Sequence, residues 1–175
     1  ATFPGIVGRP SGSGGASRAA RFDRFALTLD APILFGAYDL EEEGDERTLY
    51  NAILAIEPDP WARRQGGVGR VQRYHKAHLL PFAESPPRFL EWLGLGAAIP
   101  GLPNFGRGPG TRLLPIERSP SDYVRIAPIL CSESLVVDHV ASAARLGADL
   151  LVNIGSDGWF GNHGEPELHL ALASF

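Results

Sequence analysis

The chain has 175 residues, of which 44% are hydrophobic and 21% are charged. This length predicts one domain with a sizeable core, and the composition excludes a wholly disordered chain. Sixteen Lys and Arg against twenty Asp and Glu give a net charge of −4, so we expect no nucleic acid as a partner, because phosphate binding needs a basic surface. The single cysteine excludes an internal disulfide, and no run of apolar residues is long enough to predict a transmembrane helix.

The first 20 residues differ from the rest of the chain. They are rich in Gly and Ser and contain no apolar signal-peptide region, which predicts a flexible or aberrant N-terminal segment over 1–20. We expect the remaining residues, 21–175, to form a partial catalytic domain. The chain contains no Met and begins with Ala1, so we also expect it to be processed or cut from something longer.

Short apolar runs alternate with turns and helical patterns along the chain. We expect strands at 33–37, 49–56, 68–74, 123–130 and 149–154, and helices at 18–29, 88–95 and 134–146. Between them we expect an acidic turn at 39–47 and an elaborated proline-rich loop over 85–120. The strand–helix–strand order from 123 to 154 predicts an α/β fold with its functional residues at the ends of strands.

Cys131 lies between the strand at 123–130 and the helix at 134–146. A turn of this kind presents its side chain at the end of a sheet, and a helix N-terminus lowers the pKa of a thiol. These features make Cys131 a candidate nucleophile. The alternative is a small buried core residue, because free cysteine is among the most buried residue types.

Three charged residues lie close to the ends of predicted elements. Lys76 follows the strand at 68–74 and can supply a positive charge or a proton in a buried site, although a solvated surface lysine is the alternative. Glu84 and Glu133 are the nearby acids. Both can also be explained as solvated carboxylates, and Glu133 as a partner of the helix dipole. The histidines and the cysteine lack the spacing of a zinc site, so we expect neither a metal nor another cofactor.

Three stretches resemble motifs of the nitrilase, or carbon–nitrogen hydrolase, superfamily, and within it of the apolipoprotein N-acyltransferase family. They are Tyr74–Glu84, which is similar to Tyr-x-Lys-x-His-Leu-Val-Pro-Phe-Gly-Glu, Ile129–Glu133, which is similar to Ile-Cys-Tyr-Glu, and Ala148–Gly161, which contains Trp-Phe-Gly. The resemblance covers roughly residues 21–175. It implies a four-layer αββα sandwich, truncated here at one or both ends.

The resemblance also implies the chemistry of the site. Cys131 corresponds to the nucleophile and Lys76 to the catalytic lysine, while Glu84 and Glu133 correspond to two acids that support the site. In such a family the cysteine takes an acyl chain from a phospholipid donor as a thioester. It then passes the chain to the N-terminal amine of a diacylglyceryl-Cys apolipoprotein acceptor. The implied location is the bacterial inner membrane, with the catalytic domain on its periplasmic face and held there by segments absent from this chain.

The chain departs from the family pattern at the general base. The family carries a glutamate in a Trp-Pro-Glu-like motif, and the nearest counterpart here, Phe3-Pro4-Gly5, places Gly5 at that position. Either the chain begins after the true motif, or residues 1–20 are foreign, or the base is lost. Ser132 also replaces the family's tyrosine, and we expect the chain to stop before the family's last strands.

Three other interpretations stay open. The chain can be a soluble nitrilase-type amidase that uses water as the acceptor. It can be a catalytically dead domain that is retained for binding, because the general base has no counterpart. It can also be a structural α/β module without a site, which would hold Lys76 and Cys131 apart. Under the acyltransferase interpretation, the exposed-looking apolar residues of the 85–120 loop predict a lid that faces lipid; they are Phe89, Trp92, Leu93 and Leu95.

Overall fold

The computed structural model of the chain describes residues 6–8, 28, 31–59, 64, 69–93, 104–119, 121–155 and 165–174. The elements in these residues are β1 (Ile6–Gly8), β2 (Ile33–Glu43), β3 (Glu46–Glu57), β4 (Arg70–His75), α3 (Arg88–Trp92), β5 (Leu114–Ser119), β6 (Asp122–Leu130), the 3₁₀ helix η2 (Cys131–Leu135), α4 (Val137–Arg145), β7 (Leu150–Ile154) and α5 (Glu165–Ala173). The predicted strands all appear, with ends that differ by at most three residues, except that β2 continues six residues beyond the predicted strand at 33–37. The predicted helix at 18–29 lies outside the described residues except for Thr28.

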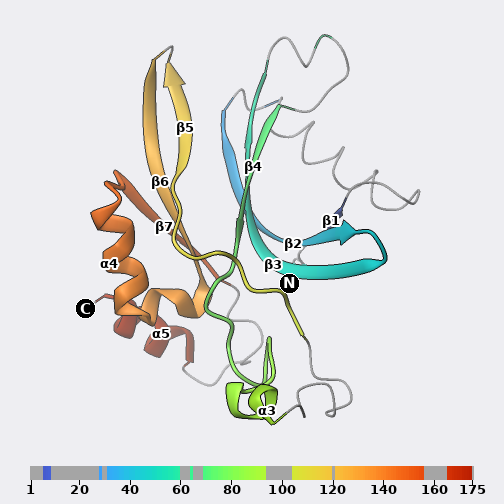
Figure 1. Cartoon of the computed structure of the whole chain (residues 1–175). Helices are drawn as coiled ribbons and strands as arrows, with labels where there is room; N and C mark the ends of the chain where they lie inside the picture. The colour runs from blue at the N-terminus through green and yellow to red at the C-terminus, as the bar shows by residue number, and fades with distance from the viewer. Residues whose placement is uncertain are drawn as a thin grey trace.

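The strands form two sheets, with the order β1-β2-β3-β4 in one and β5-β6-β7 in the other. The two sheets stand beside each other, and α4 lies against the outer side of the β5-β6-β7 sheet (Figure 1). The core fills the space between the sheets and contains Ile53, Ala55, Tyr74, Leu114, Ile116, Ile126 and Leu130. The α/β fold is therefore confirmed, and the described residues show a helical layer and both sheet layers of the expected sandwich.

The long hairpin of β2 and β3 forms the middle of the first sheet. The two strands pair antiparallel from Ile33 opposite Ile56 to Glu43 opposite Glu46. The expected acidic turn at 39–47 is wrong in its extent, because only residues 44 and 45 turn and the acidic residues around them continue the strands. Gly44 adopts a φ of 63° in this turn, a conformation that suits glycine. The acidic strand ends lie outside the core and are exposed, so their charge does not disfavour the hairpin.

The second sheet contains the predicted strand–helix–strand unit. β6 pairs parallel with β7, and the inner half of β6, from Ile126 to Leu130, is buried throughout, as expected for a strand that is covered on both faces. The intervening helix begins at Val137 rather than at residue 134, because residues 131–135 form η2. It ends before Gly147, which has a φ of 84° and closes the helix as predicted.

Three of the described elements were not predicted. β1 lies within residues 1–20, where no strand was expected, and pairs parallel with β2. β5 lies inside the expected loop of 85–120. It alternates buried Leu114 and Ile116 with exposed neighbours, but Pro115 interrupts the pattern. Because β5 is the edge strand of its sheet, a proline without an N–H group is tolerated there. The third unpredicted element is α5, whose exposed leucines give no amphipathic pattern. None of the described helices is both long and apolar enough to cross a bilayer.

Candidate active site

Lys76 follows directly after β4 and is buried, with 1% of its surface exposed. Its backbone N–H donates to the carbonyl oxygen of Asn51 at 2.8 Å, which continues the pairing of β4 with β3. Its Nζ donates to Oε2 of Glu84 at 2.6 Å. A buried ammonium group requires a partner of opposite charge, and Glu84 meets this requirement. The alternative of a solvated surface lysine is therefore wrong.

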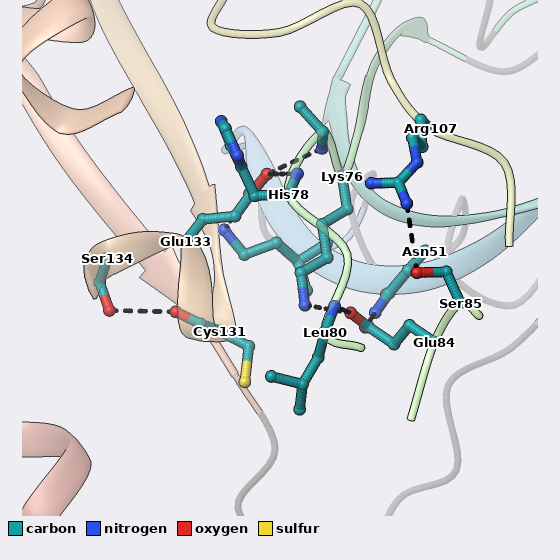
Figure 2. A network of polar contacts seen from close by, with 12 residues as sticks. Asn51, Lys76, His78, Leu80, Glu84, Ser85, Arg107, Cys131, Glu133 and Ser134 are labelled. Atoms are coloured by element: carbon teal, nitrogen blue, oxygen red, sulfur yellow. Dashed lines mark hydrogen bonds and ion pairs between the residues drawn. The ribbon is translucent and has the colours of Figure 1, made fainter. Parts of the chain in front are cut away.

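The carboxylate of Glu84 is fixed by donors from three directions (Figure 2). Besides Lys76, the backbone N–H of Leu80 donates to Oε2 at 2.7 Å, and Nδ2 of Asn51 donates to Oε1 at 2.7 Å. The backbone carbonyl of Glu84 accepts a further bond from the N–H of Phe105 at 2.9 Å. The turn that carries Glu84 is thereby attached to β3, to β4 and to the segment that precedes β5.

Asn51 is a site residue that the sequence analysis did not single out. It lies within β3 among apolar neighbours, and Ala52, Ile53 and Leu54 after it are fully buried. The signal was present in the sequence, because an amide side chain inside an apolar run requires a hydrogen-bond partner. The identity of that partner, 33 positions further along the chain, could not be read from the pattern.

Cys131 begins η2 immediately after β6, and its side chain is half-buried. Its φ is 53°, a left-handed conformation that non-glycine residues rarely adopt and that marks strained functional turns. Gly155, just after β7, lies against it, since a Cβ at Gly155 would be only 3.8 Å from the Cys131 sulfur. The Oγ of Ser134 donates to the carbonyl of Cys131 at 3.0 Å. The predicted strand-to-helix position of Cys131 is confirmed.

Glu133 is completely buried and connects the two halves of the site. Its Oε1 accepts from the backbone N–H groups of Ala77 at 2.8 Å and His78 at 3.0 Å. Its Oε2 accepts from the backbone N–H of Leu130 at 2.9 Å and from the hydroxyl of Tyr74 at 2.7 Å. One carboxylate therefore joins the backbone after Lys76 to the backbone before Cys131, and the alternative of a solvated carboxylate is wrong.

Tyr74 supplies the only side-chain donor in the described contacts of Glu133. Burial, and then the adjacent carboxylate of Glu133, raise the pKa of Tyr74 far above its usual value. The phenol therefore stays protonated and donates to Glu133 throughout the physiological pH range. Tyr74 was noted only as part of a motif in the sequence, and its role as a donor depends on a contact across 59 positions.

All four predicted site residues lie at one end of the two sheets. The structure brings Lys76 and Glu84 into direct contact, and it joins the Lys76 segment to the Cys131 turn through Glu133. In Figure 2, the sulfur of Cys131 points away from the η2 turn and is drawn beside the side chain of Leu80. A nucleophile candidate, a buried cation and two fixed carboxylates at one place are the components of covalent acyl-transfer chemistry.

One group of side chains in the described residues has donor atoms close enough together for a metal ion. Asp39, Glu41 and His75 place one ligand atom each within 4.8 Å of one another. However, Oδ2 of Asp39 is already 2.8 Å from Nε2 of His75 and 3.2 Å from the guanidinium of Arg73. A cation would have to displace Arg73, so the arrangement fits an ion pair better than a metal centre. The expectation of no metal and no cofactor stays a prediction.

Comparison with known proteins identifies a family and relatives with names. Residues 11–174 match the family described as carbon-nitrogen hydrolase. The apolipoprotein N-acyltransferase of Bdellovibrio bacteriovorus is 33% identical over 147 residues, which cover 82% of this chain and 25% of that protein. The apolipoprotein N-acyltransferase of Caulobacter vibrioides is 33% identical over 145 residues, again 82% of this chain and 25% of that protein. The chain spans about a quarter of the length of the curated relatives that it matches.

A solved structure supports the fold independently. A cysteine-to-alanine mutant of the Nesterenkonia AN1 amidase, from the nitrilase superfamily, superposes with a TM-score of 0.52 at 15% sequence identity, covering 94% of this chain and 51% of that chain. At this identity the likeness concerns the fold alone. Because the family match extends over nearly all of the sequence, the chain belongs to the carbon–nitrogen hydrolase family.

Proposed function

We propose that the protein is an acyltransferase that moves an acyl chain from a phospholipid to the N-terminal amine of a diacylglyceryl-Cys apolipoprotein, through a thioester on Cys131. The observation that carries this proposal is the buried Lys76–Glu84 pair, which Glu133 attaches to the strained turn of Cys131. The two named acyltransferase relatives favour this reaction over other reactions of the family.

In the first step, the thiolate of Cys131 attacks the ester carbonyl of the phospholipid. The new C–S bond forms, the carbonyl becomes a tetrahedral oxyanion, and the ester C–O bond then breaks. The lysophospholipid leaves as an alcohol and takes up the proton that the thiol has lost. In our proposal the ammonium of Lys76 and the backbone N–H of Ser132 stabilise the oxyanion, because fixed donors in a site shielded from water act without reorganisation.

In the second step, the amine of the lipoprotein attacks the thioester. An amide bond forms, the C–S bond breaks, and the sulfur recovers a proton from the attacking amine. Both steps pass through the same oxyanion position, so one arrangement of Lys76 and backbone donors serves both. Glu84 maintains the position of the ammonium group, and Glu133 maintains the distance between the two segments.

Exposed apolar side chains next to the site support a lipid substrate. They lie in the turn that carries Glu84, in α3 and just after α3, and they are Leu80, Phe82, Phe89, Trp92 and Leu93. Trp92 is 85% exposed, which is unusual for the largest apolar side chain. We propose residues 80–93 as the lipid-facing lid in place of the expected 85–120 loop, because 114–119 form β5, Leu95 lies outside the described residues, and the exposed Leu80 and Phe82 precede that loop. On this proposal the lid faces the outer leaflet of the bacterial inner membrane.

The test is intact-protein mass spectrometry after incubation with phosphatidylethanolamine vesicles. We expect a mass increment of one acyl chain on Cys131, absent in Cys131→Ala. Addition of a synthetic diacylglyceryl-Cys peptide should remove the increment and yield the N-acylated peptide. No increment with vesicles, together with release of ammonia from small amides, would instead support the amidase alternative. No increment and no amide turnover would support the domain without catalytic activity.

A further inference from the structure

Two buried side chains and the partly exposed Thr111, all outside the predicted site, form a row of hydrogen bonds that ends at Glu133. The hydroxyl of Tyr74 lies 2.7 Å from Oε2 of Glu133 and 3.1 Å from Nε2 of His139. The other ring nitrogen of His139, Nδ1, lies 3.0 Å from Oγ1 of Thr111. Tyr74 and His139 are 1% and 3% exposed, respectively. These residues come from β4, α4 and the segment before β5, so the row joins three parts of the chain to one carboxylate.

The donors in this row can be assigned from their chemistry. The carboxylate of Glu133 accepts only, so the single proton of the Tyr74 hydroxyl points to it. The oxygen of Tyr74 then accepts from His139, which requires a proton on Nε2. In the neutral ring Nδ1 is an acceptor, and Thr111 is its donor. The three contacts are thus consistent with one tautomer of a neutral histidine, and each buried polar atom has a partner.

The surroundings of His139 favour that neutral form. Burial lowers the pKa of His139, the charge of Glu133 opposes this, and His78 lowers it further. The ring of His78 stands edge-on to that of His139, with 5.0 Å between their centroids. Glu133, His78 and Tyr74 are the titratable groups that the described contacts place around it. The hydroxyl of Thr111 can also donate to the backbone carbonyl of His139 at 3.3 Å. If His139 gains a proton at Nδ1, Thr111 can turn its own proton to this carbonyl and accept from Nδ1.

We propose that His139 is a positioning residue of the active site: through Tyr74 it orients the Glu133 carboxylate that holds the Lys76 and Cys131 segments together. His139 does not touch the reacting atoms; it fixes the direction of the Tyr74 hydroxyl. This inference rests on the proposed roles of Lys76 and Cys131. Without His139 the Tyr74 ring and hydroxyl lose one of their two fixed partners, and the Glu133 carboxylate gains freedom to rotate away from Ala77 and Leu130. A shift of about 1 Å between reacting groups is enough to cost on the order of a hundredfold in rate.

Two substitutions separate the hydrogen bond from the volume of the ring. His139→Gln retains an N–H donor that can reach Tyr74, whereas His139→Leu fills the space without a donor. Ile56→Val serves as the matched stability control, because Ile56 is buried in β3 and makes no described contact with the row. It is expected to lower the stability of the chain modestly without altering the site.

The kinetic readout uses p-nitrophenyl butyrate as an acyl donor in a single turnover. The Cys131 thiolate forms the C–S bond, the aryl ester C–O bond breaks, and p-nitrophenolate leaves with the electron pair. We expect the burst of His139→Leu to be at least about tenfold slower than that of the unmodified chain. We expect the bursts of His139→Gln and Ile56→Val to lie within about threefold of it, and Cys131→Ala to show none. A burst from His139→Leu at the unmodified rate would overturn the inference.

A spectroscopic readout tests the row without any substrate. In ¹⁵N NMR of the unmodified chain, we expect the Nε2 of His139 to carry the proton and Nδ1 to resonate as an unprotonated acceptor. Loss of this signature in Tyr74→Phe would support the assignment, and an Nδ1-protonated neutral ring would overturn it. If the unmodified chain shows no burst but has the expected tautomer, the proposed role of Cys131 fails while the hydrogen-bond row stands. The two failures are therefore distinguishable.

Discussion

The side-chain amide of Asn51 donates a hydrogen bond of 2.7 Å to the carboxylate of Glu84, while the backbone carbonyl of Asn51 accepts one of 2.8 Å from Lys76. One residue in the middle of a buried strand thus positions both members of the Lys76–Glu84 ion pair. The amide is a donor that cannot ionise, so it orients the acid without competing for the charge of the lysine.

Two substitutions of Asn51 should therefore differ in the size of their effect, because only one of them introduces a negative charge. Asn51→Ala removes one donor from Glu84, and we expect a burst about tenfold slower than that of the unmodified chain, with a loss of about 1–2 kcal/mol in stability. Asn51→Asp places a second carboxylate against Glu84, so we expect it to be slower and less stable than Asn51→Ala. Burst kinetics and urea unfolding measure both effects. If the burst rate and the stability of Asn51→Asp equal or exceed those of Asn51→Ala, Asn51 does not act as a donor to Glu84.

Substitutions of Lys76 and Glu84 should show that the ammonium group contributes to stability and to the burst rate in different ways. Lys76→Met leaves the carboxylate of Glu84 without its cation, and we expect a loss of about 3–5 kcal/mol and a burst slower by about 10²–10³-fold. In the double variant Lys76→Met/Glu84→Gln the uncompensated charge is gone, so part of the stability should return while the burst stays slow. Recovery of the burst together with the stability would show that Lys76 is structural and takes no part in acyl transfer.

The sequence was most informative where the signal is local. The continuous apolar run of β6, the helical spacing of α4 and the closing Gly147 predicted the unit that carries Cys131, because each depends on neighbouring residues. Likewise, the motif resemblance predicted Lys76 and Glu84, whose Nζ and Oε2 atoms lie 2.6 Å apart. The four-layer arrangement came from that resemblance and not from periodicity.

What the sequence did not predict depends on contacts between distant positions. Asn51, Tyr74 and His139 act through partners 33, 59 and 65 positions away, and no spacing rule connects such pairs. β5 was missed for a different reason, since prolines predict a loop unless the strand is known to lie at an edge. The hairpin of β2 and β3 extends past the core into solvent, where acidic residues resemble a turn in sequence.

The burial of His139 predicts a pH dependence of stability. The pKa of His139 is lowered, first by desolvation, while the unfolded chain titrates near about 6.5. As the pH falls below that value, the unfolded state takes up a proton that the folded state does not yet bind, so the free energy of unfolding decreases. The decrease ends once the pH passes the lowered pKa of the folded state. Above about pH 7 His139 contributes no slope.

The difference between the unmodified chain and His139→Gln isolates this contribution. We expect urea unfolding between pH 5 and pH 7.5 to show a steeper loss of stability on acidification in the unmodified chain, because glutamine does not titrate. Exposed groups contribute equally to both proteins and cancel in the difference. Parallel curves, or a steeper curve for His139→Gln, would mean that His139 is not held neutral by its surroundings.

Glu57 provides a contrast, because it links the two sheets by partly buried polar contacts that do not involve Glu133 or Glu84. Its Oε1 accepts from Nε of Arg70 at 2.7 Å and from Nε2 of Gln72 at 2.9 Å, and its Oε2 accepts from the backbone N–H of Glu117 on β5 at 2.7 Å. In Glu57→Gln, one of the two carboxylate oxygens is replaced by an NH₂ group. This group is itself a donor, so it faces the N–H donors on that side without accepting from them. We expect a loss of about 1–3 kcal/mol in urea unfolding.

The burst rate of Glu57→Gln under native conditions should stay within about twofold of the unmodified rate. The reason is that no described hydrogen bond connects Glu57 to Lys76, Glu84 or Cys131, and substitutions at independent sites do not affect each other. The exposed side chain of Glu117 gives the control, since Glu117→Gln should change stability by no more than about 0.5 kcal/mol. If the burst is slowed as strongly in Glu57→Gln as in Asn51→Ala, weaker packing between the two sheets is sufficient to disturb the active site. The Asn51 effect would then reflect general loosening of the sheet packing and not the orientation of Glu84.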